Sequence, residues 1–238
     1  MIIGGTAISS LDFPGKIALV IFCGGCVIRC PYCHNPEIID GGKSIDLEDI
    51  FSKIEDSLEF IDGIVITGGE ALIQAEDVEK ILKFCKNHSL HTKIDTNGCF
   101  PNRLKKIIHL IDYIGLDVKA PFNKYEEIIG SPVGDKVKDT MKICLNSPDT
   151  YLECKTTYVP TLMDEDHVVT IAKEIDCDLY TLQQFRNRVV LDEKLKKVPS
   201  PTRDELLKIA KQVKPYLKNV KIKTSEFGEE IIKEEKAK

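Results

Sequence analysis

The sequence lacks any apolar stretch long enough to cross a membrane, since its longest run, residues 17–23, has only the length of a strand. It begins Met1-Ile-Ile-Gly-Gly and so lacks the basic segment, apolar stretch and cleavage site of a secretion signal. Positive charge is not in excess either: 33 lysines and arginines face 38 aspartates and glutamates, which argues against a nucleic-acid binder. We therefore expect a cytoplasmic protein with neither a membrane nor a nucleic acid as its partner.

The chain also lacks a linker rich in proline, glycine or serine that would divide it into domains. An apolar content of 42% and a charged content of 30% are ordinary for a soluble globular protein and exclude a disordered chain. Only residues 229–238 combine mixed charges with few apolar side chains. We expect one domain over residues 1–228, followed by a charged tail over residues 229–238.

Short β-branched runs alternate with amphipathic segments along the chain. The runs predict strands at residues 17–23, 63–67, 92–96, 113–118, 151–158 and 179–183, with a seventh at 220–223. Helices are predicted at residues 47–60, 74–87, 101–109, 135–145, 164–175 and 202–216. Asp46, Asp164 and Thr202 are the predicted N-caps of three of them.

Strand–helix alternation favours an α/β fold with a parallel sheet, because each right-handed crossover returns the chain to the same edge. Six such units could form a doubly wound sheet or a barrel. A complete eight-unit barrel takes roughly 250 residues. The sequence therefore predicts an incomplete (βα)6 TIM-like barrel.

Polar motifs follow four of the predicted strands. They are residues 23–35, 68–70, 96–98 and 117–119. Because ligands bind at the carboxyl ends of parallel strands, these motifs predict an active site at one rim of the sheet.

Four of the nine cysteines lie within eleven residues, from Cys23 to Cys33. The run Cys26-Val-Ile-Arg-Cys30-Pro-Tyr-Cys33 has a C-x3-C-x2-C spacing. Two zinc-binding pairs would be separated by only three residues, and a plant-type ferredoxin spacing differs by one residue. From spacing alone, an iron–sulfur cluster is favoured over zinc, and both stay open.

This cysteine run, with an aromatic residue before Cys33, resembles the signature of the radical S-adenosylmethionine (SAM) enzymes. Residues 10–16 and 33–37 resemble the branch that activates glycyl-radical enzymes, most closely the activators of anaerobic ribonucleoside-triphosphate reductase. The resemblance implies that Cys26, Cys30 and Cys33 hold three irons of one 4Fe–4S cluster and leave the fourth iron to SAM. It also implies that Cys23 is a buried bystander.

The resemblance further implies a set of residues around SAM. Glu70 and the two glycines before it would receive the SAM ammonium, Asp117 the ribose hydroxyls and Lys119 the carboxylate. Asp95 would help to hold a monovalent cation. The complete implied set is Tyr32, Cys33, His34, Gly68, Gly69, Glu70, Asp95, Asp117, Lys119, Lys155 and Arg186.

The implied activity is formation of a glycyl radical on a partner enzyme, with anaerobic ribonucleoside-triphosphate reductase as the expected partner. Reduced ferredoxin or flavodoxin would supply the electron. Two alternatives stay open at this point. One is a radical SAM enzyme acting on a small molecule, such as a deazapurine precursor synthase, and the other is a zinc- or cluster-bearing module without catalysis.

Overall fold

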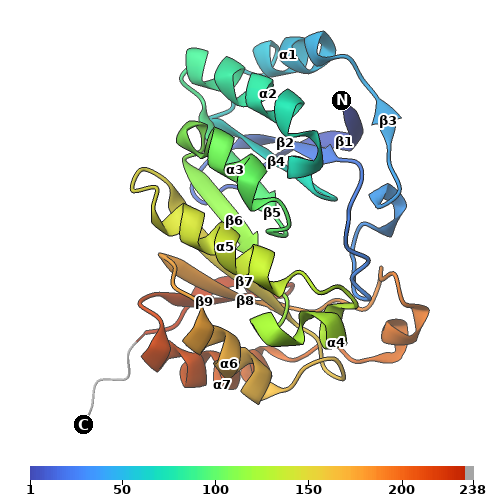
Figure 1. Cartoon of the computed structure of the whole chain (residues 1–238), viewed down its shortest axis with the longest axis vertical. Coiled ribbons are helices and arrows are strands. Elements are labelled where there is room, and N and C mark those ends of the chain that lie inside the picture. The colour runs from blue at the N-terminus through green and yellow to red at the C-terminus, as the bar shows by residue number, and fades with distance from the viewer. Residues whose placement is uncertain (234–238) are drawn as a thin grey trace.

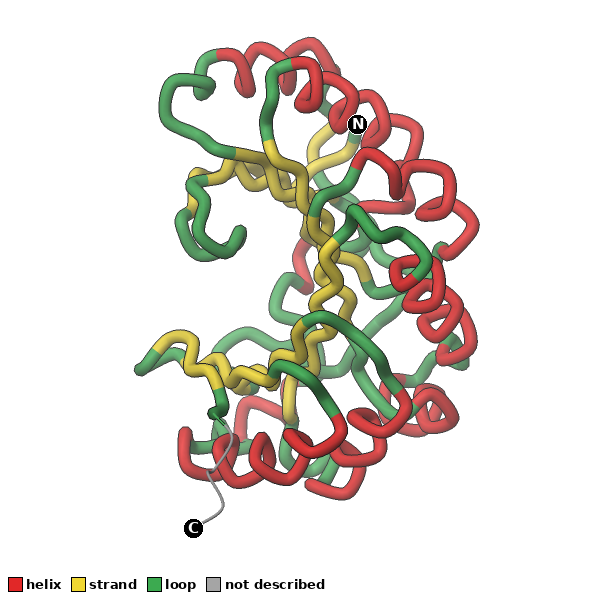
Figure 2. Tube along the Cα trace, turned by 90° about the vertical axis from the view of Figure 1, so that its left-hand side faces the viewer, coloured by secondary structure: helices red, strands yellow, loops and turns green. Residues whose placement is uncertain are grey.

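The computed structural model describes residues 1–233, in which one curved sheet carries helices on its convex side (Figures 1 and 2). The sheet has ten strands in the order β10-β9-β8-β7-β6-β5-β4-β2-β1-β3. The strands are β1 (Ile2–Ser9), β2 (Ala18–Cys23), β3 (Lys43–Ser44), β4 (Gly63–Gly68), β5 (His91–Thr96), β6 (Tyr113–Asp117), β7 (Tyr151–Tyr158), β8 (Leu179–Gln184), β9 (Val220–Thr224) and β10 (Gly228–Ile231). The α-helices are α1 (Leu47–Glu55), α2 (Ala75–Asn87), α3 (Pro101–Ile107), α4 (Tyr125–Ile129), α5 (Gly134–Leu145), α6 (Glu165–Glu174) and α7 (Arg203–Val213).

The seven strands from β2 to β9, apart from β3, are parallel, and at least one helix lies in each of the six connections between them. Figure 2 shows a crescent with strands on its concave side and helices on its convex side. The edge strands β3 and β10 do not pair with each other, so the barrel is open. The predicted incomplete (βα)6 barrel is confirmed, and the doubly wound alternative is wrong because helices do not cover both faces.

The main core lies between the convex face of the sheet and the helices. On each parallel strand, alternate residues point toward the helices and are buried and mostly apolar, as period-2 strand geometry requires. The apolar stripe of α2 packs against them, and its four residues, Val78, Ile81, Leu82 and Cys85, are fully buried. Their i, i+3, i+4, i+7 spacing places them on one face of the helix and so orients α2 on the sheet.

The concave face of the sheet is different, because polar and charged side chains alternate there with the buried apolar ones. Lys93 and Asp95 on β5 face Glu153 and Lys155 on β7 across β6. A second small apolar cluster closes one end of this face, formed by Phe13, Ala18, Val20, Val65 and Tyr113. The open barrel therefore carries charge in its interior.

The structure adds a strand that the sequence does not predict. β1 pairs antiparallel with β2, and Gln74 binds the N–H and carbonyl of Ile2 at 2.6 and 2.8 Å. Gly4 and Gly5 weaken the strand signal in this segment, because glycine has low strand propensity. Pairing with β2 and the hydrogen bonds to Gln74 therefore stabilise a strand whose local strand propensity is low.

The predicted tail boundary is also wrong. Residues 229–231 belong to β10, which pairs antiparallel with β9, and Glu230 binds Arg203 through two hydrogen bonds of 2.6 and 2.7 Å. Glu229 also pairs with Lys221 and Lys223, so two charges of the predicted tail are paired in the fold. The remaining residues of the predicted tail, 234–238, lie outside the described residues.

Helix ends follow the predicted caps in two of three cases. Asp164 and Thr202 each accept a hydrogen bond from the third residue of their helix, forming capping boxes with His167 and Glu205. Asp46 occupies the N-cap position of α1 without a side-chain cap bond.

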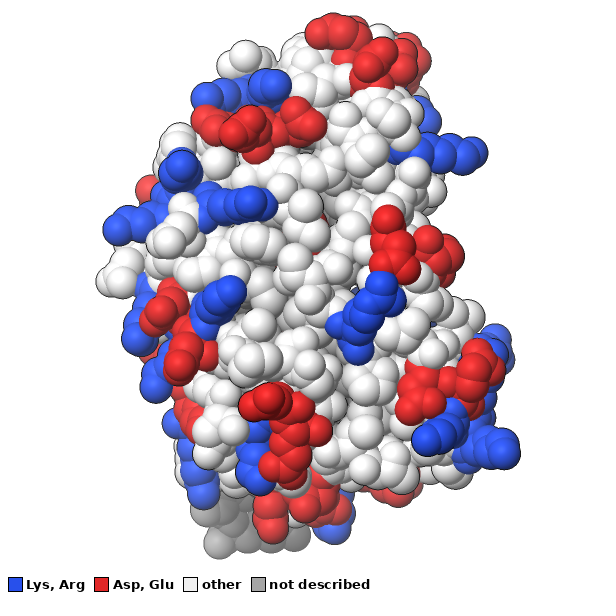
Figure 3. All heavy atoms as spheres, turned by 45° about the vertical axis from the view of Figure 1, so that its right-hand side comes forward, with Lys and Arg blue, Asp and Glu red and all other residues white. Residues whose placement is uncertain are grey.

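The length of the helices and the charge of the surface relate to the expectation that neither a membrane nor a nucleic acid is a partner. None of the helices within residues 1–233 has the length and apolar character needed to cross a membrane. Acidic and basic side chains are interspersed over the face seen in Figure 3, without a broad patch of either sign.

Candidate active site

The carboxyl ends of the parallel strands meet the loop after β2 around a cavity of about 180 Å³. All four polar strand-end motifs predicted from the sequence contribute residues to its wall, so they meet around one space. The lining residues are Cys26, Ile28, Cys30, Tyr32, Cys33, His34, Asn35, Gly68, Gly69, Asn97, Asp117, Lys119, Thr157 and Gln183.

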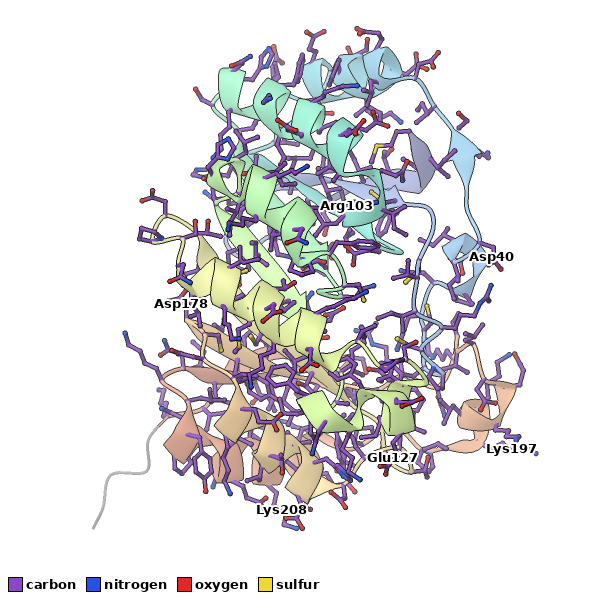
Figure 4. The ribbon with its side chains drawn as sticks, viewed as in Figure 1. Asp40, Arg103, Glu127, Asp178, Lys197 and Lys208 are labelled. Atoms are coloured by element: carbon purple, nitrogen blue, oxygen red, sulfur yellow. The ribbon has the colours of Figure 1, made fainter. Side chains whose placement is uncertain are left out.

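The loop that carries the cysteines is held by its own backbone. The N–H of Cys26 donates to the carbonyl of Ile39 at 2.9 Å, which ties the start of the loop to its end. Arg29 donates to Asp40, the residue labelled at the edge of the loop in Figure 4. These contacts fix the loop before any ligand binds.

Three thiols face the cavity and a fourth does not. Cys26, Cys30 and Cys33 line it, whereas Cys23 is fully buried in the core behind the end of β2. Burial raises the pKa of Cys30 to about 11, so its proton must leave when a metal binds. The expected separation of Cys23 from the other three agrees with this geometry.

The three thiols suit a cluster better than a single ion. Within residues 1–233 no three cysteine, histidine or acidic side chains converge as one metal ion requires. A 4Fe–4S cluster instead bonds each cysteine to a different iron, which spaces the thiolates around the wall of a cavity. The donor set and its arrangement therefore fit a cluster with three protein ligands, and they disfavour zinc.

The glycines after β4 bring two loops into close contact. Gly68 has a φ of +111°, a conformation that L-residues rarely adopt, and both it and Gly69 line the cavity. A Cβ on Gly69 would lie 2.2 Å from the carbonyl oxygen of Gly25. Behind them Arg103, labelled in Figure 4, donates to two carbonyls of the turn at residues 71–74, at 2.8 Å each.

Glu70 does not line the cavity, although the sequence places it beside the ligand ammonium. Its carboxylate accepts hydrogen bonds from Leu72 N–H (3.0 Å), Thr96 Oγ1 (2.8 Å) and Asn97 N–H (2.7 Å). Burial raises its pKa to about 7, and these three donors only partly offset that effect. Glu70 thus joins the ends of β4 and β5, and its implied contact with the SAM ammonium stays a prediction.

Asp117 and Lys119 lie at the end of β6 as a pair, with 3.0 Å between Lys119 Nζ and Asp117 Oδ2. Burial would raise the pKa of Asp117, but Lys119 and Lys155 outweigh it and hold that pKa below its ordinary value. The cavity therefore presents an ionised carboxylate and an ammonium next to the three thiols. Such a pair suits a ligand that carries both hydroxyls and a carboxylate.

Asp95 and Lys155 lie behind this wall. Lys155 Nζ is 2.8 Å from Asp95 Oδ1 and 3.4 Å from Asp117 Oδ1, and Lys93 Nζ is 2.9 Å from Asp95 Oδ1. Although burial opposes ionisation, Lys155 and Lys93 hold the pKa of Asp95 well below its ordinary value. Two ammonium groups already neutralise this carboxylate, which argues against the monovalent cation that the resemblance implies near Asp95.

Tyr32 and His34 line the cavity beside the cysteines. The Tyr32 hydroxyl is buried and has no hydrogen-bond partner, which marks it as a group that a ligand could satisfy. Burial, followed by the charges of Arg186 and Lys119, lowers the pKa of His34. Arg186 lies outside this cavity and lines a neighbouring one of about 190 Å³, to which His34 also contributes.

Several lining residues have no role predicted from the sequence. Asn97 lies in the polar motif after β5, for which only Asp95 has a predicted role. Thr157 and Gln183 stand at the carboxyl ends of two predicted strands, and this position is the signal that could have found them. Ile28 and Asn35 flank the cysteine run.

Two solved structures share the fold of this chain. Streptococcus suis SuiB bound to S-adenosylmethionine matches with a TM-score of 0.66 at 16% identity, over 87% of this chain and 50% of SuiB. A domain of pyruvate-formate lyase-activating enzyme from Bacteroides vulgatus matches with a TM-score of 0.56 at 16% identity, over 68% of this chain and 99% of that domain. This chain spans about half the length of SuiB. At these identities the likeness concerns the fold alone.

Sequence comparison adds the family. Residues 20–175 match the radical SAM superfamily. A protein of Methanocaldococcus jannaschii whose name assigns it to the glycyl-radical enzyme activating enzymes is 38% identical over 233 residues, covering 94% of this chain and 96% of that protein. Pyruvate formate-lyase-activating enzyme of Clostridium pasteurianum is 28% identical over 226 residues, covering 87% of this chain and 94% of that enzyme. The chain belongs to the radical SAM superfamily and, within it, to the glycyl-radical enzyme activating enzymes.

Proposed function

We propose that this protein generates a glycyl radical on an anaerobic ribonucleoside-triphosphate reductase, using SAM bound at a 4Fe–4S cluster. The observation that carries the proposal is the meeting of Cys26, Cys30 and Cys33 with Asp117 and Lys119 around one cavity. As a member of its family the chain is an oxidoreductase whose cofactors are a 4Fe–4S cluster and SAM. A non-catalytic binding module is no longer an alternative.

The cofactors and the protein's own residues have different tasks in the reaction. When bound, the reduced cluster supplies one electron that cleaves the sulfonium S–C5′ bond of SAM, giving methionine and a 5′-deoxyadenosyl radical that takes a hydrogen atom from glycine Cα. Reduced ferredoxin or flavodoxin in the cytoplasm replaces that electron. The protein's own residues would bind SAM and orient its C5′ carbon toward the substrate.

Each lining residue has a task that its chemistry supports. The carbonyls at Gly68 and Gly69 accept the SAM ammonium, because neither residue has a side chain to keep the ligand away. Lys119 pairs with the SAM carboxylate, and Asp117 accepts hydrogen bonds from the ribose hydroxyls. Tyr32 packs beside the adenine.

The open barrel supports a protein substrate. A glycine in a folded enzyme must approach C5′ to within roughly 3–3.5 Å, so its loop has to enter the active site. A sheet whose edges β3 and β10 stay apart leaves a side through which such a loop can pass. The choice of reductase rests on residues 10–16 and 33–37, which resemble its activators, whereas several relatives bear the name of a pyruvate formate-lyase activator.

The test is anaerobic reconstitution with iron, sulfide and SAM, followed by reduction in the presence of the reductase. We expect a glycyl radical signal by electron paramagnetic resonance, and deuterium in 5′-deoxyadenosine when the reductase glycine is deuterated. Cys30→Ala is the matched inactive control, because it removes one cluster ligand. A signal on pyruvate formate-lyase instead would make the partner wrong. Absence of label, with stoichiometric consumption of a small heterocycle, would favour the small-molecule alternative.

A further inference from the structure

Asn97 connects the end of β5 to the cysteine loop. Its side chain is 4% exposed, and its Nδ2 lies 3.6 Å from Cys26 Sγ, within hydrogen-bond distance for sulfur. The backbone N–H of Ile28 also donates to this sulfur. Cys26 therefore has two hydrogen-bond donors, one from its own loop and one from a different strand.

The orientation of the Asn97 amide is fixed by its other contact. Oδ1 accepts a hydrogen bond from Cys99 N–H at 3.0 Å, and this bond identifies the oxygen and turns Nδ2 toward the sulfur. The backbone of Asn97 is fixed as well, because its N–H donates to Glu70 Oε2 at 2.7 Å. A residue held at both ends can aim its N–H group at one atom.

A hydrogen bond to a cysteine sulfur changes the redox balance of the cluster that this sulfur holds. Reduction adds negative charge, which spreads onto the sulfur ligands, and an N–H donor stabilises the more negative state. Loss of that donor lowers the reduction potential. The same contact also holds the sulfur in place while the cluster assembles.

We infer that Asn97 is a positioning residue for Cys26 and raises the reduction potential of the 4Fe–4S cluster through its Nδ2–H···Sγ hydrogen bond. This inference uses the cluster of the family and does not depend on the identity of the radical acceptor. It gives Asn97 a task that differs from ligand binding, although the residue also lines the cavity.

The experiment compares two variants of the reconstituted holoenzyme. Both lack the Nδ2–H donor of Asn97, and they differ in whether a side-chain oxygen remains. Asn97→Ala removes the whole amide, whereas Asn97→Asp keeps an oxygen that can accept from Cys99 N–H. We expect both variants to bind about four irons, on the cluster chemistry of the three cysteines. The midpoint potential, measured by redox titration with electron paramagnetic resonance and without SAM or partner, should shift to more negative values in both.

Thr96→Val is the matched control within the same turn. Thr96 Oγ1 donates to Glu70 and accepts from Gly98 N–H, and neither bond involves a cysteine. We expect its potential to equal that of the unmodified protein. An equal shift in Thr96→Val, an unchanged potential in Asn97→Ala, or a folded Asn97→Asp that assembles no cluster would overturn the inference. The last result would assign Asn97 a structural role only.

Discussion

Lys155 Nζ lies 2.8 Å from Asp95 Oδ1, so one ion pair joins β7 to β5 across the full width of β6. Gly115 is the residue of β6 that lies between them. A Cβ at this position would be 2.0 Å from Asp95 Oδ1 and 3.0 Å from Lys155 Nζ. The ion pair can therefore occupy this position only because Gly115 has no side chain.

Gly115→Ala should destabilise the protein by about 1–3 kcal/mol, the usual cost of overpacking, because the new methyl group pushes the ion pair apart. Chemical denaturation of the apoprotein measures the effect. In an Asp95→Ala background the carboxylate is gone, and the same glycine substitution should cost much less. An equal cost in both backgrounds would show that the methyl group clashes with something other than the carboxylate.

Monovalent cations should have no effect on SAM affinity in the reconstituted protein, because Lys93 and Lys155 already neutralise Asp95. Titration calorimetry in potassium, sodium or choline chloride at one ionic strength tests this. Lys155→Ala leaves space beside two carboxylates, so its affinity should fall and be partly restored by potassium but not by choline. Potassium dependence of the unmodified protein would instead mean that Asp95 binds an external cation.

Cluster content should separate Cys23 from the three cysteines of the loop. Cys30→Ala removes a thiol from the cavity wall and should lose the cluster after anaerobic reconstitution. Cys23→Ala alters a core residue outside the cavity and should keep about four irons per chain. Iron analysis and the visible absorption spectrum measure this. The opposite pattern would reassign the ligands.

The stability of the apoprotein should depend on Glu70 between about pH 4.5 and pH 7. Burial raises the folded-state pKa to about 7 from the ordinary 4.5, so the unfolded chain ionises first and folding loses free energy as pH rises through this window. Glu70→Gln cannot ionise. Its free energy of unfolding relative to the unmodified protein should therefore increase with pH, by at most about 3 kcal/mol, and level off above pH 7.

Denaturant unfolding of both proteins at several pH values gives this difference directly. A difference that stays constant from pH 4.5 to pH 7 would mean that Glu70 is ionised throughout. The three hydrogen bonds to its carboxylate would then outweigh its burial.

Tyr32→Phe should separate ligand binding from stability. The buried hydroxyl has no partner in the protein, so its removal should not lower the free energy of unfolding of the apoprotein. If bound SAM satisfies the hydroxyl, affinity should fall by about 1 kcal/mol, or roughly fivefold. Tyr125→Phe is the control, because that hydroxyl accepts from Lys119 N–H at 2.9 Å and its loss should reduce stability. Unchanged SAM affinity in Tyr32→Phe would remove the hydroxyl from the site.

Much of the fold follows from local patterns. The β-branched runs and the amphipathic segments between them predict all seven parallel strands and six of the helices, because these elements bury one stripe or one face each. β1 and β10 do not show such a pattern, since β1 contains two glycines and β10 is an edge strand with two consecutive glutamates. Both form through hydrogen bonds to a neighbouring strand, which sequence periodicity does not record.

The cysteine site is indicated by the sequence itself, because the C-x3-C-x2-C spacing places three thiols within eight residues of one loop. The placement of polar motifs after strands is determined in the same way, since parallel strands end at one rim. Side-chain direction is decided only by the tertiary structure. Glu70 turns toward Asn97 and Asp95 toward Lys155, because a buried carboxylate must find donors or cations, and those partners come from strands distant in the chain.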